Sequence, residues 1–212
     1  MTLEEGASRI GLALASQQLD QLRAYLSMLQ KWNKVYNLTA VRDPAEMLTH
    51  HLLDSLAVIP PLLKQQGDRP FKLLDVGSGG GLPGAVIAIC CPQVTVSCVD
   101  TVAKKAAFQQ QIALELRLPN LRGIHARVET LTDTQDVVCS RAFASLLDFT
   151  NWTGKSVGQS GVWMAMKGKH PADELADLPP EVEVFHVEHI SVPGLDAERC
   201  IVWMKPVWVQ AA

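Results

Sequence analysis

Midway along the chain lies the sequence Leu73-Leu74-Asp75-Val76-Gly77-Ser78-Gly79-Gly80-Gly81-Leu82-Pro83-Gly84, in which an apolar run leads into clustered glycines. The apolar run predicts a buried strand, and a proline after the glycines suits the first turn of a helix. Glycine lets the backbone turn sharply and lets a ligand lie against the main chain, because no Cβ is in the way. We therefore expect a strand, a ligand-binding loop and a helix in succession.

From Phe71 onward, short apolar runs alternate with helical patterns. We expect strands at Lys72–Val76, Val94–Val99, Leu121–His125, Val137–Ser140, Gly161–Met166, Val182–Val187 and Cys200–Met204. We expect helices at Pro83–Cys90, Val102–Arg117, Leu146–Val157 and Ala172–Leu178. This alternation predicts an α/β fold with a mostly parallel sheet covered on both faces. A turn-like segment, Pro193-Gly194-Leu195-Asp196, joins the last two strands and predicts an antiparallel pair.

The first sixty residues show helical patterns, and Gln65 to Pro70 form a polar connector. Leucines recur every three or four positions as one buried stripe, at Leu19, Leu22, Leu26 and Leu29. A second helix has a start signal, with Asp43 as its cap and Pro44 in its first turn, and should end near Pro60-Pro61. We therefore expect a helical extension, residues 1–66, packed on a core formed by residues 67–212.

Composition excludes several classes of protein. Hydrophobic residues make up 48% of the 212 residues and charged residues 19%, which is ample for a core and argues against general disorder. Apolar runs are too short for a membrane span, and the N-terminus lacks the basic flank of an export signal, so we expect a cytoplasmic protein without a membrane partner. The five cysteines form no C-x-x-C pair, and His186 and His189 lack partners, so we expect neither disulfides nor a metal site.

Charge is distributed unevenly along the chain. The formal net charge is −3, yet Thr101 to Arg127 contains five basic residues and one acidic residue, whereas Pro171 to Ile190 contains six acidic residues and no Lys or Arg. Such polarity is compatible with a basic face that binds phosphate, and equally with solvated helix faces of opposite sign.

Two carboxylates bear on the choice of ligand at the glycine loop. Asp75, two residues before Gly77, would repel a pyrophosphate and favour a ligand that carries an ammonium and a sulfonium. Asp100 ends the next strand, where a carboxylate can accept hydrogen bonds from ribose hydroxyls, although NAD enzymes use such an acid too. Together these features resemble the S-adenosylmethionine site of class I methyltransferases, with a structural turn or an NAD site as the alternatives.

The end of the fourth strand, Val137-Val138-Cys139-Ser140-Arg141-Ala142-Phe143, bears on the methyl acceptor. It lacks an acid or amide followed by two prolines and an aromatic residue, so nothing indicates exocyclic amine chemistry. Cys139 is either a nucleophile toward a pyrimidine or a buried thiol. Arg141 either binds phosphate or guanine or forms a surface ion pair. Guanine N7 carries no proton, so its methylation needs no general base, and a site without an evident base permits that acceptor.

Several segments together resemble one family across nearly the whole chain. They are Trp32-Asn33-Lys34-Val35-Tyr36-Asn37-Leu38-Thr39, His51-Leu52-Leu53-Asp54-Ser55, Asp75 to Gly84, Arg127-Val128-Glu129, Ser140-Arg141-Ala142-Phe143-Ala144 and Lys167-Gly168. They are similar to the bacterial 16S rRNA guanine-N7 methyltransferases, the RsmG or glucose-inhibited division protein B family. One departure is His50, where we expect Arg or Lys, and histidine does not supply the permanent charge of those residues.

The resemblance implies a Rossmann-like class I fold, a seven-stranded sheet with an antiparallel C-terminal hairpin, and S-adenosylmethionine as cofactor. It implies cofactor contacts from Asp75, Gly77, Gly79, Gly81, Leu82, Asp100, Val128, Glu129 and Arg141. It places Asn37, Arg127, Arg141 and Lys167 around the acceptor guanine and its phosphates. From the residues alone, the alternative interpretations are a helix C-cap for Asn37, a solvated strand end for Lys167 and an exposed acid at a helix start for Glu129. Trp32 is a core residue or a stacking platform, and the core is favoured.

The implied reaction is methyl transfer to N7 of a guanine, position 527, in the 530 loop of 16S rRNA. The implied partner is 16S rRNA, as the 30S subunit or its assembly intermediate, with no obligate protein partner. We expect Lys104, Lys105, Arg127, Arg141 and Lys167 to add phosphate affinity. Alternatives are a class I methyltransferase for a small molecule or another RNA, and a non-catalytic RNA-binding assembly factor.

Overall fold

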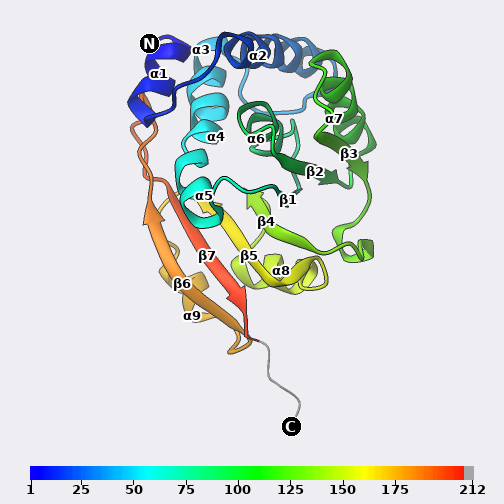
Figure 1. Cartoon of the computed structure of the whole chain (residues 1–212), viewed down its shortest axis with the longest axis vertical. Coiled ribbons are helices and arrows are strands. Elements are labelled where there is room, and N and C mark those ends of the chain that lie inside the picture. The colour runs from blue at the N-terminus through cyan, green and yellow to red at the C-terminus, as the bar shows by residue number, and fades with distance from the viewer. Residues whose placement is uncertain (208–212) are drawn as a thin grey trace.

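The computed structural model describes residues 1–207, and a seven-stranded sheet runs through its centre (Figure 1). The strands are β1 (Phe71–Val76), β2 (Val94–Asp100), β3 (Leu121–His125), β4 (Gln135–Arg141), β5 (Val157–Lys167), β6 (Val182–His189) and β7 (Cys200–Pro206). Their order is β3-β2-β1-β4-β5-β7-β6. The first five pair in parallel, and β7 is antiparallel to both β5 and β6. The predicted sheet and its antiparallel C-terminal hairpin are therefore confirmed.

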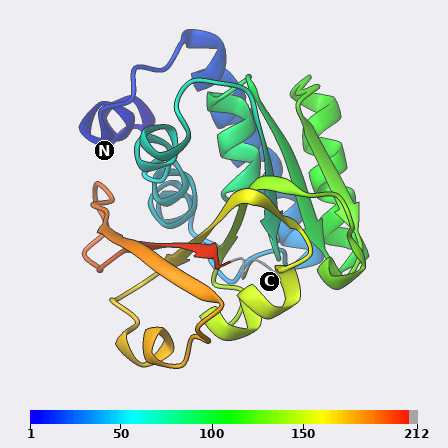
Figure 2. The same ribbon diagram turned by 60° about the horizontal axis from the view of Figure 1, so that its bottom comes forward.

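Helices cover both faces of the sheet, which lies between them in Figure 2. Beside the sheet lie α6 (Gly84–Cys90), α7 (Ala103–Glu115), the 3₁₀ turn η2 (Val128–Thr130), α8 (Leu146–Thr153) and α9 (Ala172–Ala176). Neighbouring strand residues enter different layers: Leu73 packs with α6, α7 and the N-terminal helices, whereas Leu74 packs with α8. This alternation along buried strands gives the chain two apolar layers and so two helical covers.

The N-terminal helices pack against the layer that holds α6 and α7. They are α1 (Leu3–Ile10), α2 (Ser16–Tyr36), α3 (Pro44–Met47), the π-helix η1 (Leu48–Leu53), α4 (Asp54–Leu56) and α5 (Ile59–Gln66). Of the predicted leucine stripe, Leu22 and Leu29 are fully buried, and Leu19 and Leu26 are half-buried. Residues 208–212, the end of the predicted core, lie outside the described residues.

The prediction for the second N-terminal helix is wrong at its end. Asp43 accepts hydrogen bonds from the amides of Ala45 and Glu46, as a cap should. The helix changes to π geometry at Leu48 and ends at Leu56, and Pro60-Pro61 stand in the first turn of α5 instead of stopping a helix. Proline fits there because the first helical amides have no intrahelical acceptor to lose.

Sequence segments of opposite charge lie at opposite edges of the sheet. The basic segment forms α7 and β3, and the acidic segment forms α9 and β6 (Figure 1). Because β3 and β6 are the two edge strands, the charge asymmetry becomes a polarity across the molecule, with its basic side next to the glycine loop. No helix within residues 1–207 is long and apolar enough to cross a membrane.

Candidate active site

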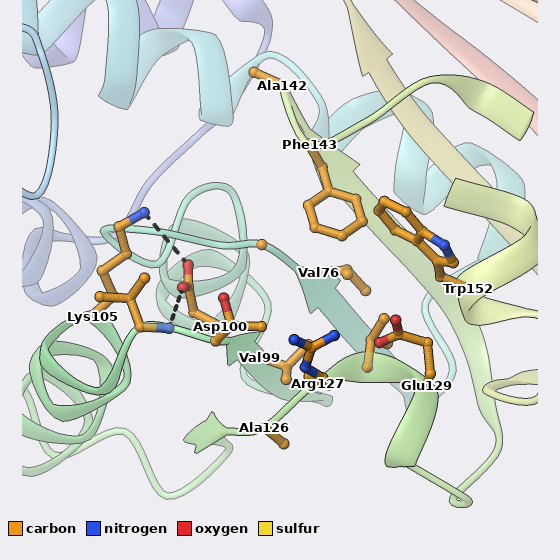
Figure 3. A pocket seen from close by; sticks show the side chains of 14 residues that line it. Val76, Val99, Asp100, Lys105, Ala126, Arg127, Glu129, Ala142, Phe143 and Trp152 are labelled. Carbon is orange, nitrogen blue, oxygen red and sulfur yellow. Dashed lines mark hydrogen bonds and ion pairs between the residues drawn. The ribbon is translucent and has the colours of Figure 1, made fainter. Parts of the chain in front are cut away.

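A cavity of about 530 Å³ opens at the carboxyl ends of β1, β2 and β4 (Figure 3). Its walls are formed by Val76, Gly77, Val99, Asp100, Thr101, Val102, Lys105, Ala126, Arg127, Val128, Glu129, Ala142, Phe143 and Trp152. Ligands of open α/β sheets bind at this edge, where neighbouring strands diverge into loops. The structure therefore brings Gly77, Asp100, Val128 and Glu129 together as the sequence predicted.

The glycine loop can take its shape only with glycine at particular positions. Gly77, Gly79 and Gly81 have φ values of +66°, +55° and +82°, which disfavour any residue with a Cβ. At Gly77 a Cβ would also overlap the ring of Phe143, which lies over the loop. The backbone of Gly77 therefore forms part of the cavity surface, whereas Gly81 and the buried Leu82 do not line the cavity. Gly79 does not line it either, but its amide donates to Asp100, which does.

Two side chains from distant segments hold this loop. The Tyr25 hydroxyl of α2 donates to the Gly80 carbonyl at 2.9 Å. The Gln109 amide of α7 donates to Ser78 Oγ at 2.8 Å and to the Gly79 carbonyl at 2.9 Å. Tyr25 and Gln109 are fully buried, so the loop is fixed from the side opposite the cavity.

Asp100 is placed to bind hydroxyl groups. Its Oδ1 accepts from the Val102 amide at 2.9 Å, and its Oδ2 accepts from the Gly79 amide at 3.0 Å, while Lys105 Nζ lies 3.8 Å from Oδ2. Each carboxylate oxygen accepts more than one hydrogen bond, so lone pairs remain for donors in the cavity. The fixed carboxylate beside the glycine backbone suits a ribose.

Asp75 lies beneath the loop and does not line the cavity. Its side chain is fully buried, and its Oδ2 accepts from the Gly84 amide of α6 at 2.8 Å. Burial raises the pKa of Asp75 to about 7, although the Gly84 hydrogen bond and the Arg141 charge oppose this rise. Asp75 Oδ1 is buried without a hydrogen-bond partner among the described residues. The structure therefore does not place the Asp75 side chain where the predicted contact with a ligand would need it. Instead, the side chain anchors α6 to β1.

Arg127 lies with the predicted cofactor residues rather than with Arg141. It is exposed and lines the same cavity wall as Val128 and Glu129 (Figure 3). Of the expected phosphate-binding lysines, Lys105 lines this cavity, and Lys104 is exposed without an ion-pair partner in the described part of the chain.

Three other predicted acceptor residues stand outside the cavity. Asn37 is exposed and is the C-cap of α2 with φ +50°, which agrees with the C-cap interpretation of this residue. Lys167 Nζ pairs with Glu174 Oε2 at 2.7 Å and donates to the Ala144 carbonyl, so it is neither solvated nor a free cation. Arg141 Nη1 donates to Asp54 Oδ2 at 3.0 Å and to the His50 carbonyl at 2.9 Å. Its ion pair is largely buried, not a surface one.

Sequence reasoning missed two aromatic walls of the cavity. Phe143 and Trp152 meet edge to face with ring centroids 5.6 Å apart, and Phe149 packs on the other side of Phe143. Phe143 belongs to the Ser-Arg-Ala-Phe-Ala segment, so the sequence offered a reason to place it at the site. Trp152 lies in a helix without any motif, so the sequence offered no such reason. Trp32, in contrast, packs half-buried between Tyr36 and Phe108 and acts as a core residue.

Three groups close to the cavity that could act as a base or a nucleophile, Cys139, Tyr25 and His51, are buried. Burial raises the pKa of the Cys139 thiol and of the Tyr25 hydroxyl well above their usual ranges. His51 is buried, its pKa is lowered to about 4 by burial and by the Arg141 charge, and its Nε2 is hydrogen-bonded to Thr39 Oγ1 at 2.7 Å. Within residues 1–207, no cluster of His, Cys, Asp or Glu suits a metal ion.

Comparison with known proteins shows the family to which this chain belongs. Residues 18–202 match the family model described as GidB, rRNA small subunit methyltransferase G. The chain belongs to the rRNA small subunit methyltransferase G family. It is 64% identical to the ribosomal RNA small subunit methyltransferase G of Polaromonas naphthalenivorans, over 97% of this chain and 95% of that one. The corresponding protein of Acidovorax sp. strain JS42 is 65% identical over 97% of this chain and 94% of its own.

Solved structures agree on the fold of this methyltransferase G family member. Magnesium protoporphyrin IX methyltransferase from Synechocystis PCC 6803, a structure with bound S-adenosylmethionine, superposes with a TM-score of 0.60 at 14% identity, over 91% of this chain and 97% of that one. TrmN from Thermus thermophilus gives 0.57 at 18% identity, over 76% and 53%. The fold is therefore that of class I methyltransferases, and the cofactor of this family is S-adenosylmethionine.

The residues of the cavity fit S-adenosylmethionine. Gly77 exposes backbone where any Cβ would meet Phe143, and Asp100 offers fixed carboxylate oxygens for ribose hydroxyls. The apolar side chains of Val99 and Val128 line the same cavity and suit a purine ring. When bound, the cofactor would supply an electrophilic methyl group.

Proposed function

We propose that this protein transfers a methyl group from S-adenosylmethionine to N7 of a guanine in 16S rRNA, at position 527 in the 530 loop. Family membership supports a small-subunit rRNA substrate. The observation that carries the choice of atom is that Cys139, His51 and Tyr25, which could act as a nucleophile or a base, are buried or hydrogen-bonded. The exposed carboxylate of the cavity, Glu129, is proposed below to bind the cofactor. An acceptor that must lose a proton would need a base.

Methylation of guanine N7 fits the state of Cys139, His51 and Tyr25. Cys139 is fully buried in β4 with a raised pKa, which opposes thiolate attack on a pyrimidine ring. His51 Nε2 and the Tyr25 hydroxyl are hydrogen-bonded to Thr39 and Gly80, and His51 Nδ1 is buried. Guanine N7 presents a lone pair without a proton, so alignment with the methyl group is the main requirement, and alignment can lower a barrier by about 7–11 kcal/mol.

Separate groups would serve the cofactor and the rRNA. For the cofactor we propose Gly77, Gly79, Asp100, Val128 and Glu129, with Asp75 and Gly81 shaping the loop from beneath. For the rRNA we propose Arg127, Arg141, Lys104 and Lys105, which lie on the basic side of the sheet or at the end of β4. Arg127 is exposed at the cavity, whereas Lys167 is already neutralised by Glu174. A phosphate would therefore be attracted to the former rather than the latter.

The helical extension has a defined part in this proposal. We propose residues 1–66 as an extension and residues 67 onward as the methyltransferase core, since α5 ends at Gln66 and β1 begins at Phe71. The extension supplies Tyr25 to the glycine loop and Asp54 to Arg141. A cytoplasmic location follows from an rRNA substrate.

The test is methylation of small subunits that lack the modification. Purified protein and labelled S-adenosylmethionine are incubated separately with naked 16S rRNA and with 30S subunits, and reverse-transcription stops locate the modified nucleotide after borohydride reduction and aniline cleavage, which break RNA at 7-methylguanosine. We expect one stop, in the 530 loop. Label incorporated elsewhere would refute the proposed nucleotide, and binding of the cofactor and rRNA without turnover would favour the assembly-factor alternative.

A further inference from the structure

A single buried carboxylate, Asp54, joins the extension to the ends of two strands. Asp54 is 2% exposed and lies at the start of α4. Its Oδ2 accepts from Arg141 Nη1 at 3.0 Å, and its Oδ1 accepts from Arg199 Nε at 2.8 Å. Arg141 is the last residue of β4, and Arg199 immediately precedes β7, so residues 54, 141 and 199 meet despite their separation in sequence.

This bridge leaves part of Arg141 available. Only Nη1 of its guanidinium has partners, the carboxylate of Asp54 and the carbonyl of His50, so Nε and Nη2 are free among the described residues. The Arg141 side chain remains 19% exposed, and the next two residues, Ala142 and Phe143, line the cavity. A guanidinium held at one corner can present its remaining N–H groups in a fixed direction.

The second arginine makes the bridge rigid. Two guanidinium groups, one at the end of β4 and one just before β7, share one carboxylate, so each oxygen of Asp54 has a charged donor. A buried carboxylate that is paired on both sides satisfies its charge, whereas loss of the carboxylate would leave two neighbouring cations without a shared counter-ion. Removing the charge of Asp54 should therefore release Arg141 from its fixed position and lower the stability of the fold.

We propose that Asp54 is a positioning residue for methyl transfer, which holds Arg141 so that its free N–H groups bind an anionic group of the reactants. The inference rests on the proposed function. The anion is either the carboxylate of the cofactor or a phosphate of the rRNA, since both fit the same donors. The two sources are separated by which binding constant changes when Arg141 is altered.

The test is a double-mutant cycle with Asp54→Asn, Arg141→Gln and the double variant. Three constants are measured on variants that are folded by circular dichroism and thermal melting: kcat on 30S subunits, Kd for S-adenosylhomocysteine by calorimetry, and Kd for rRNA by filter binding. We expect Asp54→Asn to change, by at least 10-fold, the same constant that Arg141→Gln changes. We expect the double variant to match Arg141→Gln alone, because Asp54 acts through Arg141.

Asp136→Asn is the matched control, because Asp136 is a hydrogen-bonded aspartate near the other end of β4 and pairs with Arg69. It should leave all three constants within twofold. Additive losses in the double variant would assign Asp54 a merely structural role, and so would unchanged constants in folded Asp54→Asn. If Arg141→Gln alters no constant, the proposal also fails. The two binding constants are readable without turnover, so failure of the proposed reaction would be recognised separately.

Discussion

Replacement of Asp100 by alanine should weaken cofactor binding more than any other single change at the cavity. A hydrogen bond from a ribose hydroxyl to a charged acceptor contributes about 1.5–3 kcal/mol. The loss of one such bond therefore raises Kd by roughly 10- to 150-fold. The measurement is calorimetric titration of S-adenosylhomocysteine into wild type and variant at the same pH and salt concentration.

The same substitution also has a predictable cost in stability, since Asp100 accepts from the amides of Gly79 and Val102. Loss of both bonds should lower the free energy of unfolding by about 2–4 kcal/mol and the melting temperature by roughly 4–16 °C. Asp100→Asn, which keeps one acceptor oxygen, should fall between variant and wild type, and Asp133→Ala, at an exposed acid paired with Arg122, should bind normally. A Kd for folded Asp100→Ala within twofold of wild type would remove Asp100 from the site.

Three further predictions concern the loop, the rRNA and the pH dependence. Gly77→Ala should lower stability by about 1–2 kcal/mol through its positive φ alone, and should weaken cofactor binding because the new methyl group displaces the Phe143 ring; melting curves and calorimetry measure both effects. Arg127→Ala should make the slope of log Kd for rRNA against log salt shallower by about 0.7 for each phosphate that Arg127 neutralises, and an unchanged slope would exclude Arg127 from phosphate binding. Burial lowers the pKa of His51 to about 4, so the fold favours the neutral ring, and the free energy of unfolding decreases as pH falls from about 6.5 to 4. Burial raises the pKa of Asp75 to about 7, so the fold favours the protonated carboxyl, and the free energy of unfolding decreases as pH rises from about 4 to 7. The free energy of unfolding in urea, plotted against pH, should therefore rise for Asp75→Asn, which keeps only the His51 effect. It should fall for His51→Gln, which keeps only the Asp75 effect. Parallel plots for the two variants would contradict both assignments.

Strand positions were predictable because they depend on local pattern. Each parallel strand of this fold is buried on both faces, so it reads as a short apolar run between polar segments. The strand over Leu121–His125 was predicted with its observed bounds. The strand at β5 was predicted too short, because Val157 to Ser160 carries polar residues and glycine, and only pairing with β4 at Gln135 extends the strand backward.

The places of Asp100 and Gly77 at the cavity were predictable, because one position along a strand determines them. Asp100 ends one strand and Gly77 follows another, and the carboxyl ends of parallel strands meet at one edge. The partners of Arg141 and Lys167 were not predictable, because Asp54 and Glu174 reach them only through tertiary packing. Local sequence specifies that a cation is present but not whether its charge is already neutralised.

The glycine loop itself illustrates how far local sequence reaches. Its glycines permit the positive φ values but do not select one loop shape, since glycine adopts many conformations. The shape is selected by buried donors from other segments, Tyr25 on Gly80 and Gln109 on Gly79, and by the acceptor Asp75 at the end of β1, which binds Gly84. Tyr25 comes from the helical extension and Gln109 from a helix after β2, so the cavity surface forms only when these elements are packed. The extension is thus a structural part of the proposed cofactor site, and it contributes to that site from beneath the loop.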